Sequence, residues 1–154
     1  MNGLLGVVLV AWQVASTPPP VQAPADWFGI WALNPTRSTY SPGPPPFRRA
    51  TRRIERAGDG IRIIDEMVRN RGGITHYEWT GRFDGVDAPV QGVEVVLTNA
   101  YRRIDERTLE LIQKIDGEVV ATSRVTLSAD GRTITTVNSS RTASATTVYE
   151  KRQR

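Results

Sequence analysis

The chain has 154 residues, with 20 basic and 16 acidic side chains and a formal net charge of +4. It contains no cysteine, which excludes a disulfide framework, a cysteine-ligated metal site and a lipid-anchored cysteine near the start. One short stretch has a net charge equal to that of the whole chain. It contains one acidic residue, Glu55, and the arginines Arg48, Arg49, Arg52, Arg53 and Arg56.

The first 25 residues differ from the rest of the chain. An apolar segment from Leu4 to Ala15 is too short to span a bilayer, and small residues and Pro18–Pro20 follow it. This order predicts a secretory leader and Pro-rich linker over residues 1–25, cleaved between Ala15 and Ala25, and one domain over residues 26–154. The protein would then be exported, to the periplasm or outside the cell. The leader lacks the usual early lysine or arginine, and a buried N-terminal helix is the alternative, which the prolines disfavour because they would detach it.

The aromatic segment Asp26–Asn34 predicts a first strand that ends before Pro35. Within it, Gly29-Ile30-Trp31 resembles the Gly-x-Trp signature of lipocalin-type barrels, in which the tryptophan of the first strand closes one end of the barrel. A longer pattern, GIWALNPTRSTYSPGPPP with DGVDAPVQG and the closing VYEK, resembles small exported bacterial lipocalin-like β-barrel proteins of uncharacterised function. The resemblance implies fold and export. It carries no catalytic residue to this chain.

The next two segments each allow two interpretations. Ser41–Pro46 predicts a stiff polyproline-like connection across one mouth of the barrel, with a Pro-rich recognition motif as the alternative. Phe47–Ala57 has apolar residues at near-helical spacing and would also make a basic amphipathic helix. We favour a strand, because a turn at Asp59-Gly60 couples the segment to the β-like run Ile61–Val68.

The clearest alternation runs from Thr75 to Phe83, and it predicts an inward aromatic face and an outward face that includes His76 and Glu78. Pro89 interrupts the ladder at Ala88–Gly92, which predicts a bulged or edge segment. A strand over Val95–Ile104 follows.

The rest of the chain is punctuated by Asp-Gly pairs. Asp116-Gly117 and Asp130-Gly131 predict hairpin turns, as do Asp59-Gly60 and Asp84-Gly85. The last two strands, Thr133–Asn138 and Ala143–Glu150, are rich in small residues and leave room for a cavity. The fold class is therefore all-β: an antiparallel up-and-down meander that closes into an eight- or nine-stranded lipocalin-like barrel.

Few residues suggest chemistry. His76 with Glu78 could form a general base or part of a metal site, but their strand face is predicted to be solvated, which favours a surface histidine. Asp84 and Asp87 fit a calcium loop poorly and are better explained by a turn. Asp65 and the next residue, Glu66, face opposite sides of a strand, which disfavours a paired-carboxylate site. No glycine-rich phosphate loop is present, so no cofactor and no nucleotide chemistry are predicted.

Three functional hypotheses remain. In the first, the barrel binds a small hydrophobic or amphiphilic molecule without chemistry, between aromatic walls and an arginine that meets an anionic end; the candidate residues are Trp31, Arg52, Tyr77, Trp79, Phe83, Tyr101 and Arg103. In the second, a filled barrel uses the arginine stretch to hold an anionic envelope surface or a protein partner, and not nucleic acid. An enzyme that uses His76 comes third.

Overall fold

The computed structural model describes residues 24–153, so the predicted leader up to residue 23 lies outside the described part of the chain. The strands there are β1 (Gly29–Leu33), β2 (Thr39–Ser41), β3 (Phe47–Ala57), β4 (Gly60–Arg69), β5 (Ile74–Gly81), β6 (Ala88–Gln91), β7 (Leu97–Arg103), β8 (Thr108–Ile115), β9 (Glu118–Leu127), β10 (Thr133–Ser140) and β11 (Ser144–Lys151). Within the same residues, no helix has the length and apolar character needed to cross a membrane.

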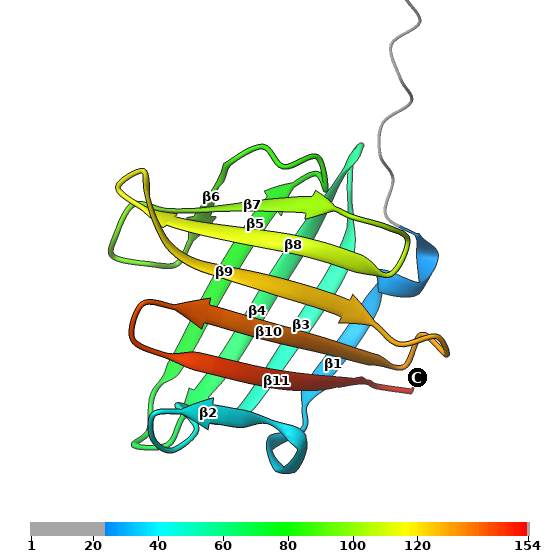
Figure 1. The fold of residues 1–154 in the computed structure, drawn as a ribbon. Coiled ribbons are helices and arrows are strands. Elements are labelled where there is room, and N and C mark those ends of the chain that lie inside the picture. The colour runs from blue at the N-terminus through cyan, green and yellow to red at the C-terminus, as the bar shows by residue number, and fades with distance from the viewer. Residues whose placement is uncertain (1–23, 154) are drawn as a thin grey trace, which may run out of the picture.

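The strands form one antiparallel meander that closes on itself. Each strand from β3 to β11 pairs with the next along the chain, β1 pairs with β3, and β1 also pairs with β11. This closure leaves a ring of ten strands, with β2 added beside β11. In Figure 1, β8 to β11 cross in front of β1, β3 and β4, so the two sets of strands form opposite walls of the barrel. The all-β lipocalin-like barrel predicted from the sequence is confirmed.

The strand count is higher than the predicted eight or nine because Ala88–Gln91 forms a strand of its own. This short strand, β6, lies between β5 and β7 and forms two residue pairs with each neighbour. Pro89 cannot donate to a ladder, which explains why the pairing stays short and the sequence suggested a bulge or an edge.

The uncertain segment Phe47–Ala57 is a strand, as the turn chemistry favoured, and β3 has those bounds. The turn itself lies one residue earlier than predicted. Ala57 pairs with Gly60, so Gly58 and Asp59 form the turn, and Gly58 takes the left-handed conformation with φ 58°. The left-handed position suits glycine because a Cβ atom is disfavoured there.

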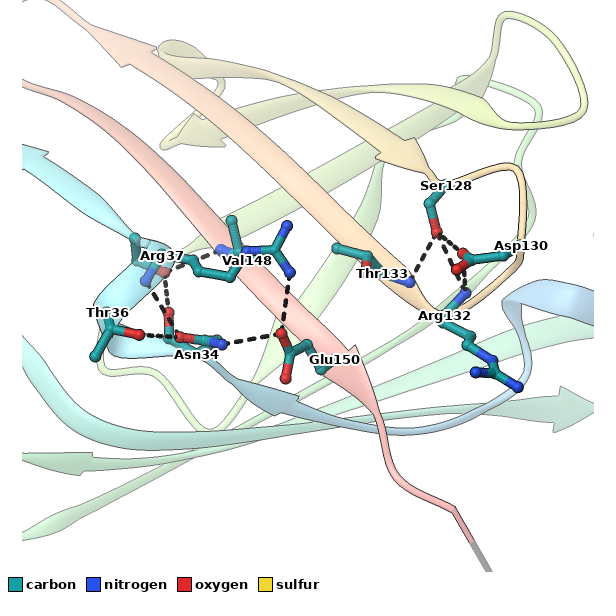
Figure 2. Close-up of polar contacts among 10 residues, drawn as sticks. Asn34, Thr36, Arg37, Ser128, Asp130, Arg132, Thr133, Val148 and Glu150 are labelled. Atoms are coloured by element: carbon teal, nitrogen blue, oxygen red, sulfur yellow. Dashed lines mark hydrogen bonds and ion pairs between the residues drawn. The ribbon is translucent and has the colours of Figure 1, made fainter.

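Of the remaining Asp-Gly pairs, only Asp116-Gly117 forms a two-residue hairpin turn in the described chain, with φ 50° and 83° between β8 and β9. Asp130-Gly131 lies in a five-residue loop, in which the Asp130 carboxylate accepts from the Arg132 backbone N–H and the Ser128 hydroxyl (Figure 2). Asp84-Gly85 is not a hairpin turn. It runs beside β7, where the Gly85 N–H donates to the Tyr101 carbonyl (2.8 Å).

The first strand is shorter than predicted and its ends are irregular. Residues Ala25–Trp27 form a 3₁₀ turn before β1, and Pro35–Arg37 form a second one after it. Asn34 holds the second turn: its side-chain oxygen accepts from the Arg37 N–H, and its amide nitrogen donates to Glu150 on β11 (2.9 Å). Figure 2 shows Asn34 and Arg37 converging on the Glu150 carboxylate. The chain thus turns at Asn34 and continues as β2 along the same edge of β11.

One end of the barrel is filled with side chains. Trp27, Trp31, Phe83, Leu127 and Ile134 are the largest fully buried residues. The Trp31 indole donates to the Trp27 carbonyl (3.2 Å), and the Trp27 indole donates to the Glu106 carbonyl (3.1 Å) in the loop after β7. Trp31 therefore packs at a closed end, as the Gly-x-Trp resemblance implies.

Candidate ligand-binding cavity

The opposite end of the barrel is hollow. A cavity of about 530 Å³ occupies the lumen there, within the range of about 300–1,000 Å³ that is usual for small-molecule sites. Its rim includes Pro42, Pro44 and Pro46, which belong to the segment predicted to cross one mouth. The Asn70 side chain, in the β4–β5 turn, donates to the Pro45 carbonyl and fastens this segment to the barrel.

Side-chain size explains where the lumen is empty. The strands β9, β10 and β11 face the cavity with small residues, among them Ser123, Thr136 and Ala145. Trp79 and Tyr101 lie across from them, with ring centroids 4.7 Å apart, and both are buried. The Trp79 indole donates to the Asn99 carbonyl (3.1 Å), which fixes the ring against β7. Small residues on one wall and a fixed aromatic wall opposite leave the space that the sequence predicted.

An ion pair lies inside the cavity. Arg52 on β3 and Asp65 on β4 are register partners, and both side chains line the lumen at about 15% exposure. Asp65 accepts from Nε and Nη2 of Arg52 at 2.7 and 2.8 Å, the two-pronged geometry of a strong arginine–carboxylate pair. The guanidinium also lies 5.3 Å from the centre of the Tyr149 ring. Both charges are therefore paired within the protein.

Burial and nearby charge shift the pKa values of Arg52 and of the two tyrosines beside it. Burial alone would lower the pKa of Arg52, but the adjacent Asp65 carboxylate outweighs burial and holds that pKa well above its ordinary value. Burial raises the pKa of Tyr101 to about 12 and that of Tyr149 to about 12, with the positive charge of Arg52 acting in the opposite direction. Arg52 thus stays charged and both phenols stay neutral at ordinary pH.

Uncharged polar side chains form a second polar region across β7 to β10. Gln113 donates to the Asn99 side-chain oxygen (3.3 Å), and Asn138 donates to the Ser123 hydroxyl (2.9 Å). Beside them, the buried hydroxyl of Thr136 has no hydrogen-bond partner among residues 24–153. All five residues line the cavity. The wall can therefore accept and donate further hydrogen bonds without carrying charge.

The structure separates the candidate residues predicted from the sequence. Arg52, Tyr77, Trp79 and Tyr101 line the cavity. Trp31 and Phe83 do not, because they fill the closed end, where Phe83 packs edge-on against Trp27. Arg103 is also outside the cavity lining, and its Nε donates to the Asp105 carbonyl at the start of the β7–β8 loop (3.3 Å).

Sequence reasoning missed Asp65 and the uncharged polar wall. In the sequence, Asp65 is weighed only together with Glu66, and an inward arginine is expected to meet the anionic end of a ligand. The available signal was the pairing of β3 and β4 about their turn, which places Arg52 opposite Asp65. Asn99, Gln113 and Asn138 gave no comparable signal, since polar residues on a strand suggest a solvated face.

The arginine stretch is divided between the lumen and the surface. Arg52 enters the lumen, and the Arg56 guanidinium lies over the Phe28 ring at 4.7 Å. Arg48, Arg49, Arg53 and Arg56 are exposed, and the register shifts between Phe47 and Arg49. The barrel is therefore hollow at one end rather than filled, and one of the five arginines of the predicted basic face points inward.

None of the other chemical candidates points its side chain into the lumen. His76 is 53% exposed and its Nδ1 is 3.6 Å from Glu66, while Glu78 is held by Arg62 at 2.7 Å. Asp84 accepts from the Val86 N–H as a turn residue, and Asp87 pairs with Lys114. Across the described residues, no group of three or more histidine and acidic side chains is placed to hold a metal ion.

Comparison with known proteins gives structural neighbours and no sequence relatives. No protein-family model and no curated protein sequence matches the chain. One similar solved structure is the N57A mutant of the fluorescent protein UnaG, with TM-score 0.56 and 14% identity over 84% of this chain and 98% of that one. Another is the fatty acid transporter REP1-NXSQ, with TM-score 0.56 and 14% identity over 85% of this chain and 99% of that one. At this identity the likeness establishes the barrel fold.

Proposed function

We propose that the protein is an exported carrier that binds a small hydrophobic or amphiphilic molecule in the barrel lumen, without chemistry. The observation that carries this proposal is the 530 Å³ cavity at one end of a barrel whose other end is filled. A barrel that only needed to fold could fill both ends. One of the two neighbouring structures is a fatty acid transporter, which supports the same proposal.

The lining supports a carrier for a mostly apolar ligand. Trp79, Tyr101, Leu111 and Val90 give the cavity apolar surface, and the polar groups gather in two places. Buried apolar area of a ligand contributes roughly 25 cal/mol per Å², and a few placed polar groups set its orientation. Export rests on the apolar segment of residues 4–15 and the small residues after it.

Native mass spectrometry of the protein, expressed from its full gene and purified gently, tests this proposal. We expect a chain that begins between Ala15 and Ala25 and carries an extra mass, which denaturing extraction removes. Thr136→Trp, which places a large ring in the cavity, should abolish the extra mass. Val137→Trp is the matched control, because Val137 is the next residue on β10 and its side chain is exposed. An unmodified protein that binds nothing, even from a panel of fatty acids, alcohols and isoprenoids, would contradict the carrier function.

A further inference from the structure

The charge balance of the cavity bears on which ligands it takes. Among the described lining residues, the charged ones are Arg52, Asp65 and Glu78. Glu78 points outward, since it neighbours the inward Trp79 on β5, and Arg62 holds both of its carboxylate oxygens at 2.7 and 2.8 Å. The side chains that remain in the lumen are one cation and one anion. The lumen therefore has no net charge.

Arg52 is not available as a counter-ion for an anionic ligand. Both oxygens of Asp65 are bound to it, and both side chains are about 85% shielded from solvent. A ligand carboxylate that approached the remaining Nη1 nitrogen would come close to the Asp65 carboxylate. It would lose its hydration and meet a like charge in a poorly solvated space, and both effects disfavour the ionised form.

An uncharged polar head meets no such penalty. The Nη1 nitrogen of Arg52 has no hydrogen-bond partner among the described residues and can donate to a neutral oxygen. The Thr136 hydroxyl is buried without a partner, and Asn99, Gln113 and Asn138 supply further neutral donors and acceptors. A hydroxyl, carbonyl or amide group can bond to either polar region.

We infer that the lumen selects uncharged amphiphiles, with an alcohol, carbonyl or amide head, over anionic amphiphiles of the same chain length. This inference rests on the proposed carrier function and names its ligand class. It replaces the sequence-based expectation that an arginine would meet an anionic end.

Three ligands that share one chain test the inference: hexadecan-1-ol, hexadecanamide and hexadecanoate, each measured against the delipidated protein by competition with a fluorescent lumen probe at pH 8. We expect the alcohol and the amide to bind at least about tenfold more tightly than the acid, a difference of about 1.4 kcal/mol. Tighter binding of hexadecanoate would overturn the inference and leave the carrier function standing. Failure of all three ligands, and of the wider panel, would contradict the carrier function itself.

Variants of the ion pair separate charge from shape. Asp65→Asn frees the charge of Arg52 and should raise hexadecanoate affinity at least about tenfold relative to hexadecan-1-ol. Glu110→Gln is the matched control, because Glu110 pairs with Arg102 outside the cavity lining. Its preference should equal that of the unmodified protein.

Asp65→Asn leaves a shielded cation without its partner and could unfold the barrel. The double variant Arg52→Gln/Asp65→Asn removes both charges at nearly constant volume, and near-ultraviolet circular dichroism reports whether each variant folds. The double variant should again prefer the alcohol and amide. Equal affinity for all three ligands in the folded double variant would overturn the role of net charge.

Discussion

Tyr101 and Tyr149 are the residues in which burial has the clearest consequence for titration. Both phenols are buried, at 3% and 7% exposure, and burial raises each pKa to about 12 from an ordinary value of 10.0. An acid whose pKa is higher in the folded state stabilises the fold fully only below its unfolded pKa. Between pH 10 and about 12 the unfolded phenols ionise first, so the fold loses stability, by about 2–3 kcal/mol for each tyrosine.

This loss can be measured in two ways. Absorbance at 295 nm should show Tyr101 and Tyr149 still protonated at pH 11, and urea unfolding should show stability falling from pH 10 upward. Tyr149→Phe should remove about half of the loss of stability that the two tyrosines cause above pH 10. It should also remove one of the two phenols that titrate late. Ionisation of all four phenols together near pH 10 would show that the two side chains are solvated.

At the scale of an element, the junction between β1 and β2 depends on one side chain. Asn34 accepts from the Arg37 N–H and from the Thr36 hydroxyl (2.8 Å), and it donates to Glu150 on β11. Asn34→Ala should lower the free energy of unfolding by about 1–2 kcal/mol, because a helix cap and a link between strands are lost together. Urea unfolding measures this change.

Glu150→Gln is the control for this junction. It keeps an acceptor for Asn34 and removes only the exposed ion pair with Arg37, whose side chains are about half exposed. We expect a change below about 0.5 kcal/mol. An equal loss in both variants would assign the stability to the charge of Glu150 rather than to the Asn34 cap.

The order of strands could be predicted because turn chemistry is local. Asp116-Gly117 specifies its turn through two left-handed residues, and the turn before Ile61 settled β3 as a strand. Local signals did not fix turn length: Asp130-Gly131 takes a five-residue loop, and the turn after β3 uses Gly58 rather than Gly60. They also did not show that β6 pairs on both sides, since tertiary pairing overrides the presence of Pro89.

At the scale of the whole molecule, the barrel divides into a filled end and a hollow end. The inward face of β5 was predicted, and with it Tyr77 and Trp79 in the cavity. Phe83 and Trp31 share an inward face with the cavity residues but lie at the other end of the barrel. Periodicity predicts which face of a strand a residue occupies, but not its position along the barrel axis. That position depends on the register and stagger of all the strands, which one sequence does not specify.

The division predicts different consequences for the same substitution at the two ends. Ile134 is fully buried in the filled end, and Ile63 is 4% exposed and lines the cavity. Ile134→Val removes a methylene group from a packed region and should cost about 0.5–1.5 kcal/mol of stability, with the affinity for hexadecan-1-ol unchanged. Ile63→Val removes a methylene group that borders the open cavity. It should therefore cost less stability, and it should change the affinity for hexadecan-1-ol. Urea unfolding and ligand competition measure both quantities on the same two proteins. Equal effects on affinity would show that the two ends respond as one core, because a change at the filled end would then reach the cavity through the packing between them.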